Sequence, residues 1–201
     1  MLTTLLPIDR DRLNSSDQTI ILSDMLWQDF EILVAQESPH YKVSFYDGII
    51  TIVSPSQNHE IIERTISILI NAYCRHNALL YFALGSTTLK RPPLAGKEPD
   101  TSYSFNSRKA TPDLAVEVIY SSGNVEDSLN KYKYLGVKEV WFWRQQEMRF
   151  YQLQNEKDGY KEINLSNYLQ LSPKFLVSFV NRGLQESPLT IENDFVRQLK
   201  N

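Results

Sequence analysis

The sequence predicts a single α/β (α+β) domain in which helices flank a mixed central sheet. Three patterns indicate this class. A long amphipathic segment lies in the first half of the chain, short strand-like runs fill the middle, and a short helical segment separates two of these runs. A crossover helix between two strands is typical of a sheet that contains a parallel pair. The length of 201 residues suits one domain with its own core.

Apolar periodicity and capping residues predict the helices. Ser23 can cap the first helix, and Ser54-Pro55-Ser56 opens the longest one, which is apolar along one face. Gly136 ends the crossover helix, because glycine readily adopts the left-handed conformation that closes a helix. The expected helical ranges are 23–36, 56–77, 125–135, 173–181 and 191–199.

Runs of β-branched and aromatic residues predict the strands. Asp47-Gly48 joins two of these runs and is a strong hairpin signal. We expect one mixed sheet from the ranges 41–46, 49–53, 79–84, 87–91, 100–105, 113–120, 140–144, 149–153 and 160–165. Residues 1–19 are expected to form a loose N-terminal arm, 20–182 the single folded domain, and 183–201 an amphipathic C-terminal tail.

Composition excludes several classes of protein. A net charge of −3 argues against a protein that coats nucleic acid or an anionic membrane by bulk charge, although a local basic groove is compatible with it. Cys74 is the only cysteine, which rules out an internal disulfide and fits a reducing compartment. No apolar run reaches membrane-spanning length, and three histidines with one cysteine do not build a structural zinc site. We therefore expect a soluble cytoplasmic protein with no membrane partner.

The most informative stretch, 112–120, places a carboxylate inside a buried strand. Glu117 lies in the middle of this apolar run, where an ionised group needs a cation, hydrogen-bond donors or a shifted pKa. Asp100 lies on the preceding strand-like segment. If the two strands are neighbours, both carboxylates can point to the same face and bind Mg²⁺ or Mn²⁺. The alternative is that Glu117 is structural and satisfied by backbone amides or an arginine.

Asp113 cannot replace Asp100 in such a site. It lies four residues before Glu117 on the same strand, roughly 13 Å away at ~3.3 Å per residue, which is too far to share one ion. We expect its carboxylate to accept hydrogen bonds from loop amides.

Four motifs together resemble the Uma-type restriction endonuclease family, a branch of the PD-(D/E)xK nuclease superfamily. They are Glu98-Pro99-Asp100, the run from Pro112 to Val118, the run from Gly136 to Trp141, and Ser54-Pro55 with His59. The resemblance covers roughly residues 20–180 and implies a restriction-endonuclease-like core with Mg²⁺- or Mn²⁺-dependent cleavage of DNA. By position, Asp100 and Glu117 match the two acidic residues that are catalytic and bind the metal. His59 and Asp113 are expected to lie next to these ligands and support them without binding the metal themselves.

The basic half of the motif departs from the family pattern. Ile119 stands where the superfamily carries its lysine, and Ser128 stands where the resembled family supplies one from the following helix. Lys131 lies one turn later on roughly the same face, so we expect it to act as the catalytic lysine. The simpler interpretation of Lys131 is an exposed ion pair with Asp127.

A local excess of basic residues favours a nucleic-acid substrate. Five of them are expected to contact phosphates: Lys90, Arg91, Lys97, Arg108 and Lys109. A solubilising loop is the alternative. We expect a metal-dependent DNA endonuclease that works as a homodimer, so that two sites cut two strands. Two alternatives stay open: a nuclease-fold protein that binds nucleic acid or a protein partner without cleavage, and an enzyme acting on another phosphate ester.

Overall fold

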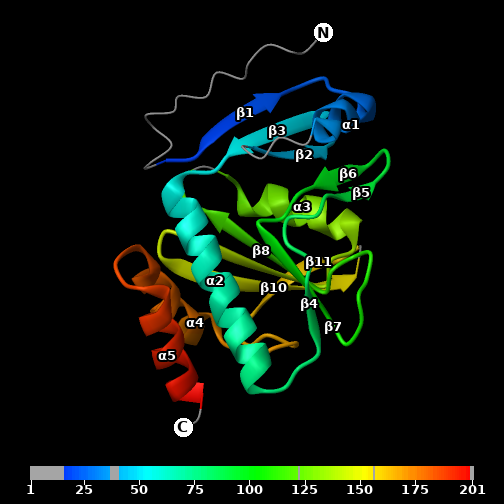
Figure 1. The fold of residues 1–201 in the computed structure, drawn as a ribbon. Coiled ribbons are helices and arrows are strands. Elements are labelled where there is room, and N and C mark those ends of the chain that lie inside the picture. The colour runs from blue at the N-terminus through cyan, green and yellow to red at the C-terminus, as the bar shows by residue number, and fades with distance from the viewer. Residues whose placement is uncertain (1–15, 37–40, 122, 156, 200–201) are drawn as a thin grey trace.

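The computed structural model describes residues 16–36, 41–121, 123–155 and 157–199. Within these ranges the chain folds into two β-sheets and five α-helices (Figure 1). In chain order the elements are β1 (Gln18–Leu22), α1 (Trp27–Ala35), β2 (Lys42–Tyr46), β3 (Ile49–Ser54), α2 (Gln57–His76), β4 (Tyr81–Ala83), β5 (Leu89–Arg91), β6 (Ala95–Lys97), β7 (Thr101–Phe105), β8 (Leu114–Ile119), α3 (Val125–Leu135), β9 (Glu139–Arg144), β10 (Glu147–Asn155), β11 (Gly159–Ile163), α4 (Pro173–Val180), the 3₁₀ helix η1 (Asn181–Leu184) and α5 (Pro188–Leu199).

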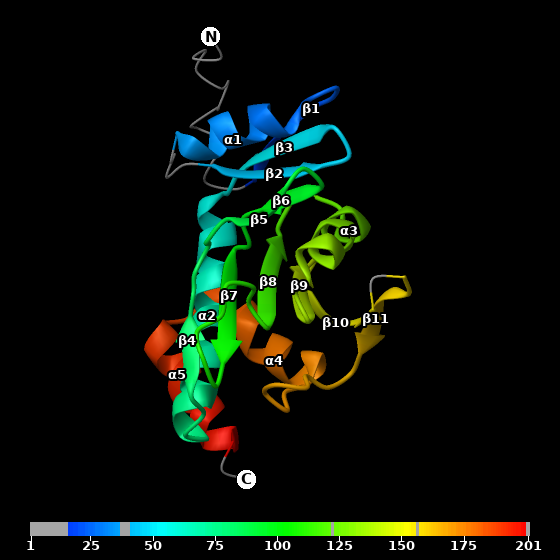
Figure 2. The same ribbon diagram turned by 90° about the vertical axis from the view of Figure 1, so that its right-hand side faces the viewer.

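The central sheet has the strand order β11-β10-β9-β8-β7-β4. Strands β8 and β9 are parallel and are joined through α3, whereas the other pairs are antiparallel. Helices α2, α4 and α5 cover one face of this sheet, and α3 lies on the other (Figures 1 and 2). The predicted α/β (α+β) class, with a mixed central sheet flanked by helices, is confirmed.

Strand β8 separates its side chains between the two faces. All six of its residues are buried. Leu114, Val116 and Val118 pack against α2, α4 and α5, while Ala115 and Ile119 pack towards α3. Because side chains alternate along a strand, Glu117 faces the α3 side, where the core is thinner.

A second, antiparallel sheet has the order β1-β3-β2-β6-β5. Its β2–β3 hairpin turns at Asp47-Gly48, both with positive φ (49° and 72°), as the sequence predicted for this dipeptide. The expectation of one sheet was therefore wrong in one respect, because the strands are divided between two sheets. Strands β1 and β6 were not predicted. Residues Ala95–Lys97 have little strand propensity, and β6 forms because β2 and β5 pair with both of its edges.

The helices agree closely with the predicted ranges, except that α1 begins later than predicted and α5 begins at Pro188, three residues before its predicted start. Ser23 does not cap α1, since Asp24 has a positive φ of 59° and the helix begins at Trp27. The carboxylate of Asp29 accepts the Leu26 amide and fixes the start there. For α2 the prediction is confirmed, because Ser56 caps it by accepting the His59 amide.

The structure describes parts of the predicted N-terminal arm and C-terminal tail. Of the expected arm, residues 1–15 lie outside the described part of the chain, and its last two residues begin β1. The expected C-terminal tail contains α5, whose Ile191 and Phe195 are buried in the main core beside α2. Among the described residues, the structure contains no helix that is both long and apolar enough to cross a bilayer.

Candidate active site

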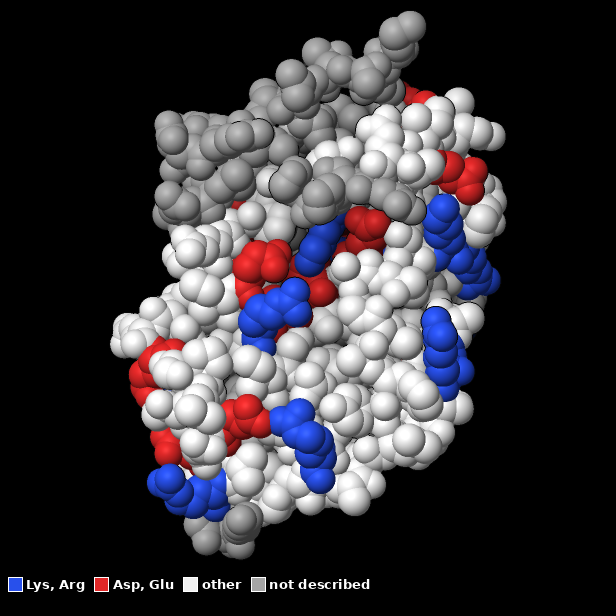
Figure 3. Space-filling model, viewed as in Figure 1, with Lys and Arg blue, Asp and Glu red and all other residues white. Residues whose placement is uncertain are grey.

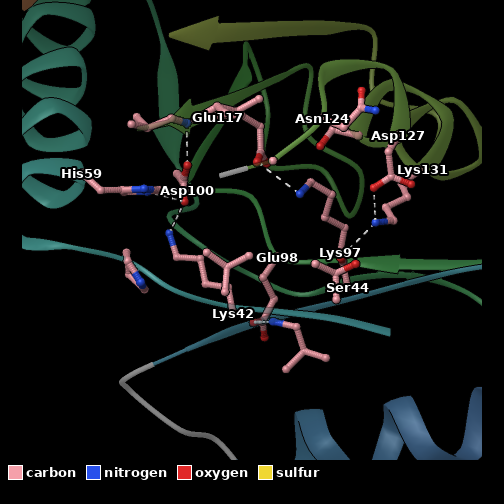
Figure 4. A pocket seen from close by; sticks show the side chains of 18 residues that line it. Lys42, Ser44, His59, Lys97, Glu98, Asp100, Glu117, Asn124, Asp127 and Lys131 are labelled. Atoms are coloured by element: carbon pink, nitrogen blue, oxygen red, sulfur yellow. Dashed lines mark hydrogen bonds and ion pairs between the residues drawn. The ribbon is translucent and has the colours of Figure 1, made fainter. Parts of the chain in front are cut away.

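A pocket lies where the second sheet meets the α3 face of the central sheet. It is lined by side chains from β2, β6, β8, the start of α2 and the start of α3, and by residues just before β7 (Figure 4). Acidic and basic side chains lie beside one another in a hollow on this side of the molecule (Figure 3). Eight lining side chains can carry charge: Lys42, His59, Lys97, Glu98, Asp100, Glu117, Asp127 and Lys131.

Asp100 is buried and tightly held. One oxygen, Oδ1, pairs with the Lys42 ammonium and lies 3.1 Å from Nε2 of His59. The other, Oδ2, accepts the Val118 amide at 2.6 Å. Burial alone would raise the pKa of Asp100, but Lys42 and His59 hold this pKa well below its usual value. Asp100 therefore carries a negative charge at neutral pH.

Glu117 is also buried and takes one partner on each oxygen. Tyr132 of α3 donates its hydroxyl to Oε1, and the Lys97 ammonium lies 3.1 Å from Oε2. Burial raises the pKa of Glu117, Lys97 opposes this effect, and the charge of Asp100 adds to the rise. Burial raises the pKa of the Tyr132 hydroxyl well above its ordinary value, and the neighbouring Glu117 raises this pKa further.

Strand pairing brings the two carboxylates together. Thr101 lies opposite Val116 in the antiparallel β7–β8 pair, and one further step along this register places Asp100 across from Glu117. Directly opposite residues of an antiparallel pair have Cβ atoms about 4.5–5.5 Å apart. The hydrogen bond from the Val118 amide to Asp100 fixes this end of the register. This register places Asp100 and Glu117 on one face, and their shared role as metal ligands stays a prediction.

His59 bridges two carboxylates at the start of α2. Its Nδ1 lies 3.1 Å from Oδ2 of Asp17, and its Nε2 faces Asp100. Burial alone would lower the pKa of His59, but Asp100 and Asp17 outweigh burial and raise it to about 10. Asp17 is fixed in turn by the Ser56 amide at 2.9 Å. The structure thus places His59 in contact with Asp100, and its supporting role at a metal site stays a prediction.

Lys131 lines the pocket but is paired away from Glu117. Its ammonium lies 2.6 Å from Oδ2 of Asp127 and 3.2 Å from Oγ of Ser44. Burial lowers the pKa of Lys131, and the nearby Lys97 ammonium lowers it further. The ion pair with Asp127 that we gave as the simpler interpretation is observed, but Lys131 itself is buried, so the expectation of an exposed pair was wrong for the lysine.

The remaining predicted residues do not converge on the pocket, except Lys97. Asp113 accepts the Phe105 amide at 2.9 Å and pairs with Lys109 at 2.6 Å, as expected of a residue that binds loop amides. It is not brought to the metal ligands as a supporting residue. Lys90 is exposed on β5, and Arg91 donates to the Tyr134 carbonyl. Arg108 and Lys109 lie beside a separate surface pocket, so the five basic residues form no single patch.

Sequence reasoning missed Lys42, Tyr132 and Asp17, and gave Lys97 a different role. Lys42 and Asp17 reach the site from the second sheet and from the segment before β1, which no short-range pattern links to Asp100. Tyr132 offered a weak signal, because it lies one residue after Lys131 on the same helix. Lys97 offered a better one, because it stands only three residues before Asp100.

The donor set of the pocket suits a hard divalent ion. Mg²⁺ prefers oxygen ligands and is commonly held by one or two carboxylates, with waters and substrate phosphates completing its shell. Asp100 and Glu117 provide such a pair. Within the described part of the chain, no cluster of three or more His, Cys, Asp and Glu side chains could hold an ion alone. An ion held by Asp100 and Glu117 would take its remaining ligands from water and substrate.

The fold and the acidic pair together define a protein of the restriction-endonuclease-like class. The family model "Uma2: Putative restriction endonuclease" matches residues 27–190, and the chain belongs to this family. This result confirms the resemblance found in the sequence motifs. The comparison with curated proteins gives no match.

A solved structure supports the same fold. It is the crystal structure of a putative nuclease belonging to DUF820 from Anabaena variabilis ATCC 29413. The two chains share a TM-score of 0.50 and 16% identity, over 69% of this chain and 90% of that chain. Identity at this level shows the common fold alone, and the family match adds the association with nucleases.

Proposed function

We propose that this protein is a metal-dependent endonuclease that hydrolyses DNA phosphodiester bonds with Asp100 and Glu117 as the metal ligands. One observation carries the proposal: two buried carboxylates from neighbouring strands face one pocket that also contains lysine side chains. Buried carboxylates in a cleft with perturbed pKa values are typical of catalytic sites. Membership of the restriction endonuclease family supports the same assignment.

The chain's own residues hold this site in place before any ion binds. The Val118 amide and His59 orient Asp100, and Tyr132 orients Glu117. A bound Mg²⁺ or Mn²⁺ would supply polarisation of the phosphate and activation of a water. Lys42 and Lys97 currently neutralise the two carboxylates, so their ammonium groups become available to phosphate oxygens when the carboxylates serve an ion.

Charge balance favours a phosphate substrate. The eight charged side chains of the pocket are four cations, counting His59, and four anions. With Asp17, which pairs with His59, the cluster has four cations and five anions, so a bound divalent ion would change its formal sum from −1 to +1. Anionic phosphate is then attracted to the pocket even though the whole chain carries a net charge of −3. We propose DNA as the substrate and a homodimer as the form that cuts both strands of a duplex.

A second candidate is a nuclease-fold protein that binds nucleic acid without cleaving it. The observation in its favour is that Ile119 and Ser128 occupy both places where a lysine is expected. A pocket whose carboxylates are already paired with Lys42 and Lys97 is also compatible with a site that holds no ion.

Plasmid cleavage separates the two candidates. Purified protein is incubated with supercoiled plasmid in Mg²⁺, in Mn²⁺ and in EDTA, beside an Asp100→Asn variant. This control keeps the shape of the side chain but removes the charge that binds the ion. The endonuclease predicts nicked and linear products in either metal, and none in EDTA or with Asp100→Asn. Equal cleavage by wild type and variant would show that a contaminating nuclease or another site is responsible.

A further inference from the structure

Lys97 is the lysine that the structure places on the acidic motif. Its ammonium lies 3.1 Å from Oε2 of Glu117, and its side chain is nine-tenths buried. The side chain also passes over the Tyr132 ring, with Nζ 5.6 Å from the ring centroid. The PD-(D/E)xK motif supplies a lysine close to its second acidic residue. In this chain Ile119 stands at that position, and Lys97 provides a cation in contact with Glu117.

The backbone that carries Lys97 is rigidly held. Strand β6 lies between β2 and β5, and Lys97 is opposite Ser44 on one side and Leu89 on the other. Three residues later the chain reaches Asp100 at the start of β7. Side chains on paired strands keep their direction better than those on loops, so this ammonium stays aimed at the pocket.

The other two lysines of the pocket are held differently. Lys131 is buried and is held by Asp127 and Ser44, so its ammonium contacts neither of the two acidic residues Asp100 and Glu117. Lys42 pairs with Asp100, the carboxylate that His59 also contacts. Ile119, which belongs to the buried cluster beside α3, and Ser128 both line the pocket, and neither side chain carries a charge.

We propose that Lys97 is a catalytic residue that donates hydrogen bonds to the scissile phosphate and stabilises the negative charge that grows on its oxygens during cleavage. The inference rests on the proposed function, and it moves the basic role from Lys131 on α3 to β6 of the second sheet. With Glu117 engaged by an ion, the Lys97 ammonium would be free to bind a phosphate oxygen. No proton is transferred by Lys97 in this step, since its role is electrostatic.

The first test compares cleavage by three single variants. Lys97→Met should reduce the metal-dependent rate by about 10²–10³-fold, because a pre-oriented donor to the developing charge is lost. Lys97→Arg should keep part of the activity, because the cation is retained. Lys161→Met is the matched control, as Lys161 is an exposed lysine of β11 that does not line the pocket, and it should cleave like wild type. Wild-type cleavage that Lys97→Met leaves unchanged overturns the proposal.

The second test moves the ammonium back to α3. The double variant Lys97→Met/Ser128→Lys should recover cleavage relative to Lys97→Met, because a lysine at position 128 reaches the same pocket. The lysine introduced at position 128 is also expected to provide a cation for Glu117. If Lys97→Met does not fold, as thermal denaturation would show, Lys97→Arg and the double variant carry the comparison. If the folded double variant shows no recovery and Lys97→Arg is as inactive as Lys97→Met, a purely electrostatic role of this cation is overturned.

A binding assay keeps the inference separate from the proposed function. The probe is thymidine 3′,5′-bisphosphate in the presence of Ca²⁺, with affinity measured by calorimetry. Lys97→Met should weaken binding by about tenfold or more, because a charge-assisted hydrogen bond to phosphate is lost, while Lys161→Met should not change it. If wild type does not cleave plasmid, the proposed function fails, and this affinity still decides the contact: a tenfold loss supports it, and equal affinities overturn it.

Discussion

Gly96 allows strand β6 to pack closely against the ring of Phe30 in α1. A Cβ at this position would lie 2.3 Å from both Cε1 and Cζ of Phe30. Carbon atoms attract each other best at about 3.5–4.0 Å, so Gly96→Ala forces an overlap of more than an ångström. Phe30 cannot turn away easily, because it is fully buried between Trp27 and Phe45. Either the ring or β6, which carries Lys97, has to move.

The expected sign of the effect comes from weighing two terms. In a strand without a steric conflict, Ala would stabilise relative to Gly by about 0.5–1 kcal/mol. Overpacking a core costs about 1–3 kcal/mol. The second term is larger, so Gly96→Ala should lower the free energy of unfolding by about 1–2 kcal/mol, measured by urea denaturation.

A double-mutant cycle tests the cause of this loss. Phe30→Leu removes the ring atoms that meet the new Cβ, so Gly96→Ala should cost less, or even stabilise, in the Phe30→Leu background. The coupling between the two changes should exceed about 0.5 kcal/mol. If the losses in unfolding free energy of the two single variants simply add in the double variant, Phe30 does not limit the position of β6. If Gly96→Ala stabilises the protein in the wild-type background, the steric argument is refuted.

Three other predictions follow from contacts described above. Cys74 is fully buried, and burial raises the pKa of its thiol to about 11. The thiol should therefore not react with Ellman's reagent at pH 8 until urea unfolds the protein. Fast reaction of the native protein would contradict its burial. Asp113→Ala should destabilise the protein by about 1–3 kcal/mol in the same denaturation assay, because it leaves the buried Phe105 amide without an acceptor. Lys109→Met should cost less than about 1 kcal/mol, since that lysine is half exposed, and an equal cost for both variants would mean that the ion pair, and not the amide bond, matters.

Local patterns predicted the parts of the fold that are decided locally. The hairpin at Asp47-Gly48, the capping of α2 by Ser56 and the end of α3 at Gly136 each depend on a few adjacent residues, and each is observed. Glu117 stood out because a carboxylate in an apolar run is costly unless it has partners, and the structure gives it two. Elements that depend on distant partners were missed. Strand β6 contains Ala-Gly-Lys and owes its existence to the strands on both sides.

The same distinction explains the candidate site. The spacing of Asp100 and Glu117 along two neighbouring strands could be read from the sequence, because strand pairing converts it into proximity. The partners Lys42 and Asp17 come from elements whose packing against the central sheet has no signature in the chain. Lys131 lines the pocket and pairs with Asp127, the i+4 contact that the sequence offered as the simpler interpretation, whereas its burial and its contact with Ser44 depend on the packing of α3 against β2.

The chain leaves the central sheet after β4, builds β5 and β6 in the second sheet, and returns at β7 (Figure 2). The acidic pair and the cations that face it therefore belong to separate structural layers. A lysine can be lost from one layer and gained in another without disturbing the strands that hold the carboxylates. A sequence motif that requires a lysine two residues after Glu117 does not describe this chain, in which Ile119 stands at that position.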